Sequence, residues 1–298
     1  SGMLRVMHLV LISGLSGSGK SIALKVLEDA NYYCVDNLPS QLLQPLVGQL
    51  ELQGYDKVGV VIDIRGGDSV AMLPLQLDAL RANELSLQFL FLDAQDATLI
   101  KRYSETRRRH PLASDRMTLT EAIAEERVRL AELIALGHHI DTSGVKANAL
   151  REWVREFVTL DESADPCQGL TLLFESFGFK NGIPLDADLV FDVRCLPNPH
   201  YDLNLRPLTG RDAPVISFLE AEPEVLRMRN DIARFIRTWL PSYVQDSRNY
   251  LTVAIGCTGG QHRSVYFAEW LRREFSDCAR VLVRHRELRS PMAIGGNP

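Results

Sequence analysis

The first half of the chain alternates continuous apolar runs with segments of helical periodicity. In each run nearly every position is apolar, whereas a strand exposed on one side would alternate apolar and polar residues. Strands are therefore expected at residues 6–12, 57–64 and 87–92. Helices are expected at residues 21–30, 70–82, 96–103, 119–136 and 147–160. This order predicts a parallel sheet that helices cover on both faces.

A second pattern begins beyond a polar stretch at residues 161–166, which contains acidic residues and a proline. Such a stretch is typical of a domain boundary. Further strands are expected at residues 170–177, 187–193, 250–255 and 281–284, and further helices at residues 222–240 and 263–275. We therefore predict an N-terminal domain at residues 1–160, a linker at 161–168 and a C-terminal α/β domain at 169–298.

Composition narrows the class of protein. The chain has 298 residues, of which 46% are hydrophobic and 24% charged, with a formal net charge of -5. These values describe an ordinary globular protein without the overall basicity of many nucleic-acid-binding proteins. The five cysteines are dispersed and odd in number, which favours a reducing cytoplasm over a disulfide framework. The apolar run at residues 9–12 is too short to cross a bilayer, and no signal peptide is recognised.

The strongest motif is a glycine-rich loop between the first strand and the first helix. Its residues are Gly14, Leu15, Ser16, Gly17, Ser18, Gly19, Lys20 and Ser21. Glycines let successive backbone N–H groups point at one phosphate chain, Lys20 reaches the terminal phosphates, and Ser21 can ligate Mg²⁺ held by the nucleotide. The helix that begins at Lys20 adds the positive end of its dipole. The motif predicts a nucleotide-binding domain of the P-loop NTPase/kinase class.

Acidic and basic residues farther along suggest additional parts of this site. Asp63 and Asp93 each end an expected strand, and either carboxylate suits Mg²⁺ bound with phosphate. Either residue is alternatively a helix N-cap, in particular Asp93, whose following helix starts a few residues later. The run Arg107, Arg108, Arg109 and His110 has the place of a lid that closes over the phosphates, or is a solvated basic turn.

A second loop, between an expected strand and an expected helix, has the spacing Cys-x5-Arg-Ser from Cys257 to Ser264. Its amides converge at a helix N-terminus, a geometry that suits an anion. The same spacing occurs in cysteine phosphatases, where the arginine binds two phosphate oxygens and a thiolate attacks phosphorus. A loop that binds a phosphate ester, an active phosphatase and a purely structural turn all remain open, and His200 is a candidate ligand contact.

Four arginines near the C-terminus form a local basic patch in an acidic chain. They are Arg280, Arg284, Arg286 and Arg289. Clustered cations suit a nucleic-acid backbone, whereas the alternative is an ordinary solvated surface.

With these motifs in place, the chain resembles the RapZ/YvcJ family of bacterial P-loop proteins over nearly its whole length. The resemblance rests on the P-loop and on several segments that are less widely shared. These are residues 33–39 (YCVDNLP), 174–180 (FESFGFK), 191–194 (FDVR), 196–200 (LPNPH) and 250–260 (YLTVAIGCTGG).

The resemblance implies ATP at Gly14–Ser21 and a GTP motif at Asp63, Ile64, Arg65 and Gly66. It also implies a C-terminal domain that senses glucosamine-6-phosphate, binds a small regulatory RNA and delivers it to RNase E. The matching pocket residues are His200, Cys257, Thr258, Gly259, Gly260, His262 and Arg263. This chain departs from the enteric members at Gln261, where they have lysine, and at its end, which lacks their Lys/Arg-rich sequence.

Three functions compete at this point: a regulatory binding protein, a small-molecule kinase that uses the P-loop and the lid, and a phosphatase centred on Cys257. The regulatory protein explains two phosphate-binding loops in one chain. We expect at most slow ATP or GTP hydrolysis, because no residue is recognisable as the group that orients an attacking water. We further expect a cytoplasmic homo-oligomer with no membrane partner.

Overall fold

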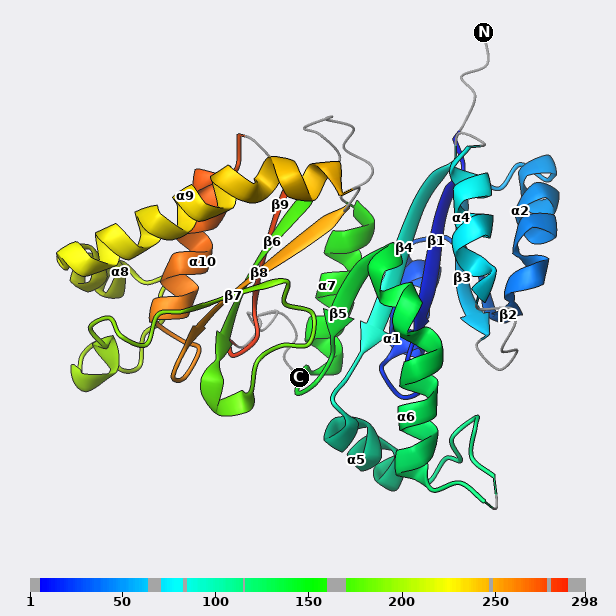
Figure 1. Cartoon of the computed structure of the whole chain (residues 1–298), viewed down its shortest axis with the longest axis horizontal. Helices are drawn as coiled ribbons and strands as arrows, with labels where there is room; N and C mark the ends of the chain where they lie inside the picture. Colours follow the sequence, from blue (N-terminus) through cyan, green and yellow to red (C-terminus); the bar gives the residue numbers. More distant parts are fainter. Residues whose placement is uncertain are drawn as a thin grey trace, which may run out of the picture. The chain divides into compact units, whose positions relative to one another are not determined.

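The computed structural model describes residues 6–63, 71–82, 85–114, 116–159, 170–246, 249–277 and 280–288 (Figure 1). The chain divides into two compact units, residues 1–164 and 165–298. Each unit contains one sheet in which every strand pair is parallel. The expected α/β class with parallel sheets is confirmed.

The first unit has a five-stranded sheet in the order β2-β3-β1-β4-β5. Its strands are β1 (His8–Gly14), β2 (Tyr33–Pro39), β3 (Lys57–Asp63), β4 (Ser86–Asp93) and β5 (His138–Asp141). Its helices are α1 (Lys20–Asp29), α2 (Leu43–Leu52), α4 (Leu73–Arg81), α5 (Asp96–Thr106), α6 (Leu119–Leu130) and α7 (Ala147–Thr159). Short 3-10 helices occupy Ser40–Leu42 and Ala131–Leu136.

Strand β1 is apolar throughout because it lies at the centre of this sheet, and all seven of its residues are buried. Leu9 and Leu11 belong to the core cluster that includes α2 and α4. On the opposite face, a Cβ at Gly59 of β3 would lie 2.7 Å from Leu27 of α1. Helices therefore cover both faces, as a parallel sheet requires.

The second unit has a four-stranded sheet in the order β7-β8-β6-β9. Its strands are β6 (Thr171–Gly178), β7 (Leu189–Asp192), β8 (Tyr250–Cys257) and β9 (Arg280–His285). Its helices are α8 (Ala213–Glu220), α9 (Pro223–Gln245) and α10 (Arg263–Glu274), with 3-10 turns at Phe179–Asn181 and Pro199–Tyr201. In the register, Thr171 pairs with Tyr250 on one side and Arg280 on the other.

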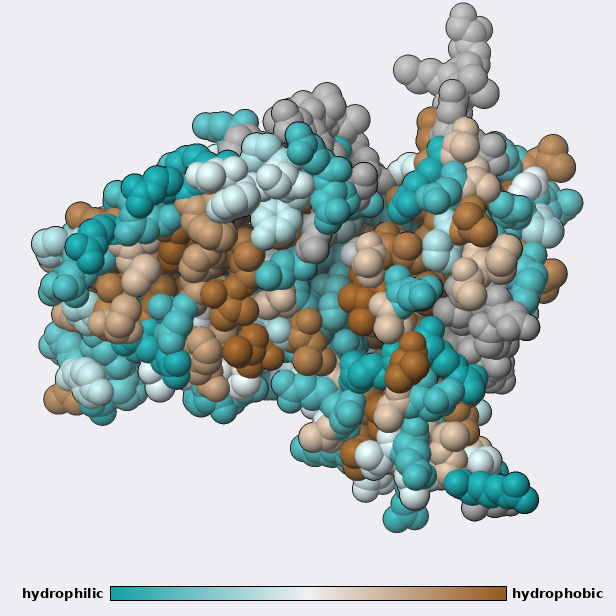
Figure 2. All heavy atoms as spheres, viewed as in Figure 1, coloured by the Kyte–Doolittle hydropathy of each residue, from teal (hydrophilic) through white to brown (hydrophobic). Residues whose placement is uncertain are grey.

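Helix α9 shows how this unit builds its core. Its buried residues, including Val225, Ile232 and Ile236, recur at helical spacing and join Leu172 and Phe174 of β6 in one cluster. Figure 2 shows hydrophilic side chains along the outer edge of α9 and hydrophobic ones beneath it. In both units the glycine-rich loops follow central strands, β1 and β8, at the carboxyl edge of the sheet, where open α/β sheets bind ligands.

Candidate functional site

The P-loop between β1 and α1 turns on three glycines with positive φ. The angles are 139° at Gly14, 86° at Gly17 and 110° at Gly19. A Cβ at Gly14 would lie 2.1 Å from the carbonyl oxygen of Leu92 in β4. Only glycine fits there, because both the backbone conformation and the close approach exclude a side chain. The loop is thereby held at the N-terminus of α1, where amides and the helix dipole favour an anion.

The cation of this loop is Lys20, the first residue of α1. Its Nζ donates hydrogen bonds to the carbonyl oxygens of Gly14 at 2.7 Å and Leu15 at 3.0 Å. Burial lowers the pKa of Lys20 from its ordinary value, while the charges of Glu126 and Asp36 act in the opposite direction. Ser21 follows and is exposed. An ammonium and an accessible hydroxyl thus begin the helix, the pair that a Mg²⁺-nucleotide uses.

Two residues distant in sequence hold the carbonyl groups of the P-loop. Arg102 of α5 donates from NH1 to the oxygen of Gly17 at 2.9 Å, and Thr142 donates from Oγ1 to the oxygen of Ser18 at 2.8 Å. Arg102 also donates to the backbone oxygen of Thr142 at 2.8 Å. Because C=O and N–H of a trans peptide point in opposite directions, the N–H of Gly19 is turned away from Thr142. Sequence reasoning assigned no role to either residue.

A buried carboxylate also braces the loop. Glu126 of α6 is 0% exposed and accepts hydrogen bonds from the backbone N–H and the hydroxyl of Ser16 and from His110. His110 therefore does not belong to an exposed basic turn, and we correct that part of the expectation. Arg107, Arg108 and Arg109 are exposed, and Arg107 is the C-cap that follows α5, with φ of 51°.

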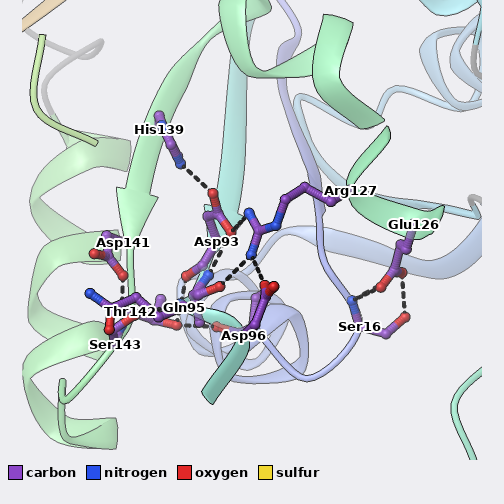
Figure 3. Close-up of polar contacts among 12 residues, drawn as sticks. Ser16, Asp93, Gln95, Asp96, Glu126, Arg127, His139, Asp141, Thr142 and Ser143 are labelled. Atoms are coloured by element: carbon purple, nitrogen blue, oxygen red, sulfur yellow. Dashed lines mark hydrogen bonds and ion pairs between the residues drawn. The ribbon is translucent and has the colours of Figure 1, made fainter. Parts of the chain in front are cut away.

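The first candidate Mg²⁺ ligand, Asp93, lies in a network of hydrogen bonds (Figure 3). Asp93 is 2% exposed, and its carboxylate accepts bonds from the N–H of Ala94 at 2.7 Å, from Arg127 at 2.9 Å and from His139 at 3.1 Å. Burial alone would raise the pKa of Asp93, but the hydrogen bonds from His139 and Arg127 hold it below its usual value. Asp93 is not the helix N-cap either, since Gln95 occupies that position.

Asp63 ends β3, the strand beside β1, and its register partner is Pro39 of β2. Ile64, Arg65 and Gly66 of the expected GTP motif lie outside the described residues. Over the described ranges, no group of three or more His, Cys, Asp or Glu could hold a metal ion.

The second loop joins β8 to α10 and folds around its own thiol. Cys257 is 3% exposed, and its Sγ accepts the backbone N–H of Gly260 at 3.2 Å and lies 3.2 Å from Oγ of Ser264. Gly260 has φ of 71°, and a Cβ there would lie 2.7 Å from the backbone nitrogen of Gly178. The thiol therefore stabilises the turn from inside.

Arg263, the first residue of α10, is buried with one half of its guanidinium anchored. Its NH1 donates to the carbonyl oxygens of Arg194 and Leu196, both at 2.8 Å. Its NH2 lies 3.4 Å from Oγ1 of Thr258, and its buried Nε has no hydrogen-bond partner among the residues that the structure describes. Nε and NH2 form one edge of the guanidinium, and such an edge binds two oxygens of a phosphate.

The histidines of the expected pocket lie close together. His262 is buried, and its Nε2–H donates to the carbonyl oxygen of Leu205 at 3.1 Å. Burial lowers the pKa of His262, although hydrogen bonds to backbone carbonyls oppose this shift. The exposed ring of His200 lies with its centroid 6.3 Å from that of His262. The structure thus brings His200 close to His262, the residue that precedes α10.

The C-terminal arginines that the structure describes differ in exposure and in their contacts. Arg284 is 1% exposed, so its burial does not fit the expected role of a direct RNA phosphate contact. Arg286 forms an ion pair at 3.1 Å with Glu175, whose pKa burial raises to about 8. Arg280 begins β9 and is half-buried, and Arg289 lies outside the described residues.

Cys34, Cys195 and Cys257, the cysteines within the described ranges, are free thiols. Over the same ranges, no helix combines the length and the apolar character that a bilayer span requires. The expected cytoplasmic location remains a prediction.

Comparison with known proteins gives a family for both units. Residues 7–162 match the family model of the RapZ-like N-terminal domain, and residues 170–289 match that of the RapZ C-terminal domain. A nucleotide-binding protein of Dechloromonas aromatica is 65% identical over 95% of this chain and 99% of its own length. One from Aromatoleum aromaticum is 64% identical over 94% of both chains.

Among solved structures, shikimate kinase from Bacteroides thetaiotaomicron aligns with a TM-score of 0.35 and 16% identity, covering 53% of this chain and 98% of that one. The family models together span both units, and the relatives are alike over nearly the full length. This chain therefore belongs to the RapZ family of nucleotide-binding proteins.

Proposed function

We propose that this chain is a regulatory protein with two phosphate sites, a nucleotide site in the first unit and a sugar-phosphate site in the second. The observation that carries the proposal is the presence of two separate anion loops, each with a cation at the first position of the following helix. These cations are Lys20 of α1 and Arg263 of α10. A helix N-terminus with a cation beside it suits phosphate.

In the first unit we infer ATP and GTP, with Mg²⁺, as ligands. Lys20 would pair with the terminal phosphates, and Ser21 would be the protein ligand of a Mg²⁺ ion that neutralises phosphate charge. Asp63 is the better candidate for the acidic partner, because the carboxylate of Asp93 already accepts hydrogen bonds from Arg127 and His139. We also infer that hydrolysis is slow.

In the second unit we infer that the loop binds a sugar phosphate without cleaving it. The Nε–NH2 edge of Arg263 supports a two-pronged phosphate contact, and the exposed Thr258 lies beside that edge. The thiol of Cys257 receives the N–H of Gly260, so its contacts support a structural role rather than that of a nucleophile. Glucosamine-6-phosphate is the ligand that the sequence resemblance suggests.

RNA binding, delivery to RNase E and homo-oligomer formation also remain proposals. Of the expected arginines that the structure describes, Arg280 and Arg286 are half-buried and are the candidates for a phosphate contact. An RNA site built on such contacts would weaken as salt rises, since phosphate neutralisation releases counterions. RNA affinity that does not change with salt would contradict this surface.

Titration of glucosamine-6-phosphate tests the second site. Arg263→Lys keeps the positive charge but loses the two-pronged edge of the guanidinium, so we expect the affinity for glucosamine-6-phosphate to fall at least tenfold. Cys257→Ser should retain most of the affinity, and Arg272→Lys, an exposed change on the same helix, should retain all of it. Phosphate release by the parent protein that Cys257→Ser abolishes would instead establish a phosphatase.

A further inference from the structure

The buried carboxylate of Glu126 links the P-loop to the exposed basic segment Arg107–Arg109. Both Glu126 oxygens lie 3.0 Å from the backbone nitrogen of Ser16, and Oε1 accepts the Ser16 hydroxyl at 2.6 Å. Glu126 and the side chain of His110 are both 0% exposed. A charged group so deeply buried is stable only when hydrogen bonds or opposite charges compensate it.

His110 provides another of these bonds, and its contacts assign its proton. The backbone N–H of Leu112 donates to Nδ1 of His110 at 3.1 Å, so Nδ1 carries the lone pair. The proton then resides on Nε2, which donates to Oε2 of Glu126 at 2.9 Å. Glu126 is therefore a common acceptor for the P-loop and for the residue that directly follows Arg109.

The ring of Tyr103 makes a second link between His110 and the P-loop. The ring of Tyr103 in α5 lies with its centroid 5.4 Å from that of His110, and a Cβ at Gly17 would lie 3.4 Å from this ring. Burial raises the pKa of Tyr103 to about 12. Residues on both sides of the basic segment are thus linked to the P-loop, Tyr103 directly and His110 through Glu126, whereas the three guanidinium groups of the segment belong to exposed side chains.

We propose that Glu126 is a positioning residue that, through His110, holds Arg107–Arg109 where they reach the terminal phosphate of a nucleoside triphosphate bound by the P-loop. The inference rests on the proposed nucleotide site. According to this proposal, recognition of the terminal phosphate depends on Glu126, although Glu126 itself does not contact the nucleotide. If Glu126 only stabilised the fold, its replacement would instead affect the binding of diphosphates and triphosphates equally.

The test compares the affinity of Mg²⁺-bound nucleoside triphosphate and diphosphate by calorimetry. Glu126→Gln keeps an acceptor for Ser16 but presents an amide in place of the second acceptor oxygen. We expect triphosphate affinity to fall about tenfold, and diphosphate affinity to change less than twofold. Glu125→Gln, an exposed change on the same helix whose partner is Arg129, is the matched control and should change neither.

A double-mutant cycle separates positioning from general damage. The second variant replaces Arg107, Arg108 and Arg109 with glutamine, and should weaken triphosphate binding to the same extent. Adding Glu126→Gln to it should cause no further loss, because both changes remove the same contact. Additive losses, equal losses for the two nucleotides, or full triphosphate affinity in the arginine variant would each overturn the proposal.

A pair of changes at His110 keeps the test decisive if Glu126→Gln does not fold. His110→Gln offers an amide N–H in place of Nε2–H and should retain the preference for triphosphate, whereas His110→Ala should lose it. Equal preference in these two variants would contradict the positioning role. Failure of the parent protein to bind either nucleotide would refute the underlying nucleotide site itself.

Discussion

The two glycine-rich loops of this protein, one after β1 and one after β8, are stabilised by different kinds of contact. In the P-loop, positive φ at Gly14, Gly17 and Gly19 shapes the turn, and side chains from other elements hold its carbonyl groups and Ser16. In the second loop, Gly260 is the glycine with positive φ, and the thiol of Cys257 accepts its N–H. The first loop depends on distant side chains, and the second largely on its own.

The cations of the two loops, Lys20 and Arg263, differ in how firmly their charged groups are held. Lys20 carries a point charge on a flexible stem that donates to loop carbonyls, so it can turn to different phosphates of a chain. Arg263 is a planar fork whose NH1 is fixed by the carbonyl groups of Arg194 and Leu196. This comparison supports the proposal of an extended polyphosphate for the first loop and of a single phosphate, held in one orientation, for the second.

The largest expected effect is that of Gly14→Ala on stability. The new Cβ would overlap backbone atoms of Leu92 in the sheet, which cannot move aside as a side chain can. We expect the first unit to lose roughly 4 kcal/mol of unfolding free energy, whereas Gly144→Ala, with φ of 69° and open space around it, should cost only ~1 kcal/mol. Urea unfolding followed by circular dichroism measures both, and equal midpoints would contradict the prediction.

The next effect concerns the charge of the P-loop. Lys20→Ala removes the cation that pairs with the terminal phosphates, so affinity for Mg²⁺-nucleotide should fall about a hundredfold, or about 3 kcal/mol. Lys25→Ala is the control, because Lys25 is exposed on the same helix and pairs with Glu28 and Asp29. Calorimetry that gives Lys20→Ala the affinity of the parent protein would remove the P-loop from nucleotide binding.

The smallest expected effect concerns the second unit, whose free energy of unfolding should depend on pH through Glu269. The hydrogen bond from His285, opposed by burial and aided by Arg211, lowers the pKa of Glu269 from 4.5 to about 2. Because the folded-state pKa is depressed, this group stabilises the fold above pH 4.5, and that stabilisation is lost as the pH falls toward 2. We expect a contribution of ~2 kcal/mol.

Unfolding of the parent protein and of Glu269→Gln between pH 6 and 3 tests this linkage. The stability of the parent should fall more steeply on acidification than that of the variant. Glu224→Gln, an exposed change on α9, should follow the parent. Parallel curves for parent and Glu269→Gln would show that Glu269 does not contribute.

Sequence patterns predicted those helices and strands whose signals lie in neighbouring residues of the chain. The apolar run of β1 and the glycine spacing before α1 lie next to each other in the chain, and both elements form where expected. Strand β2 was not expected, because polar Asp36 and Asn37 interrupt its apolar residues. The register of β2 shifts between Val35 and Leu38, and Asn37 has φ of 53°, so the strand bulges at these polar positions.

The structure also differs from the expectation at the end of α6, because apolar residues at helical spacing fit both an α-helix and a 3-10 helix. Residues 119–136 were expected to form one helix, but α6 ends at Leu130 and a 3-10 segment follows. Helix α8 was also not expected.

The candidate site was predictable only where its residues form one motif. The P-loop residues are consecutive, so spacing alone identified them. Glu126 lies 110 positions from Ser16, and Thr142 lies 124 positions from Ser18. No local pattern relates such pairs, because the sheet order, and not the sequence, brings them together. The basic run from Arg107 to His110 was treated as one unit, yet its histidine faces the core.

The pairing of β6 has a consequence for biosynthesis. Thr171 of β6 finds its neighbours only at Tyr250 and Arg280, the second of which lies close to the end of the chain. The last strand of the first sheet, β5, is complete at Asp141. During translation the first unit can therefore close while the second still lacks most of its strands. A ribosome that stalls before β9 would leave the central strand β6 with one edge unpaired, a surface on which chaperones act and from which aggregation begins.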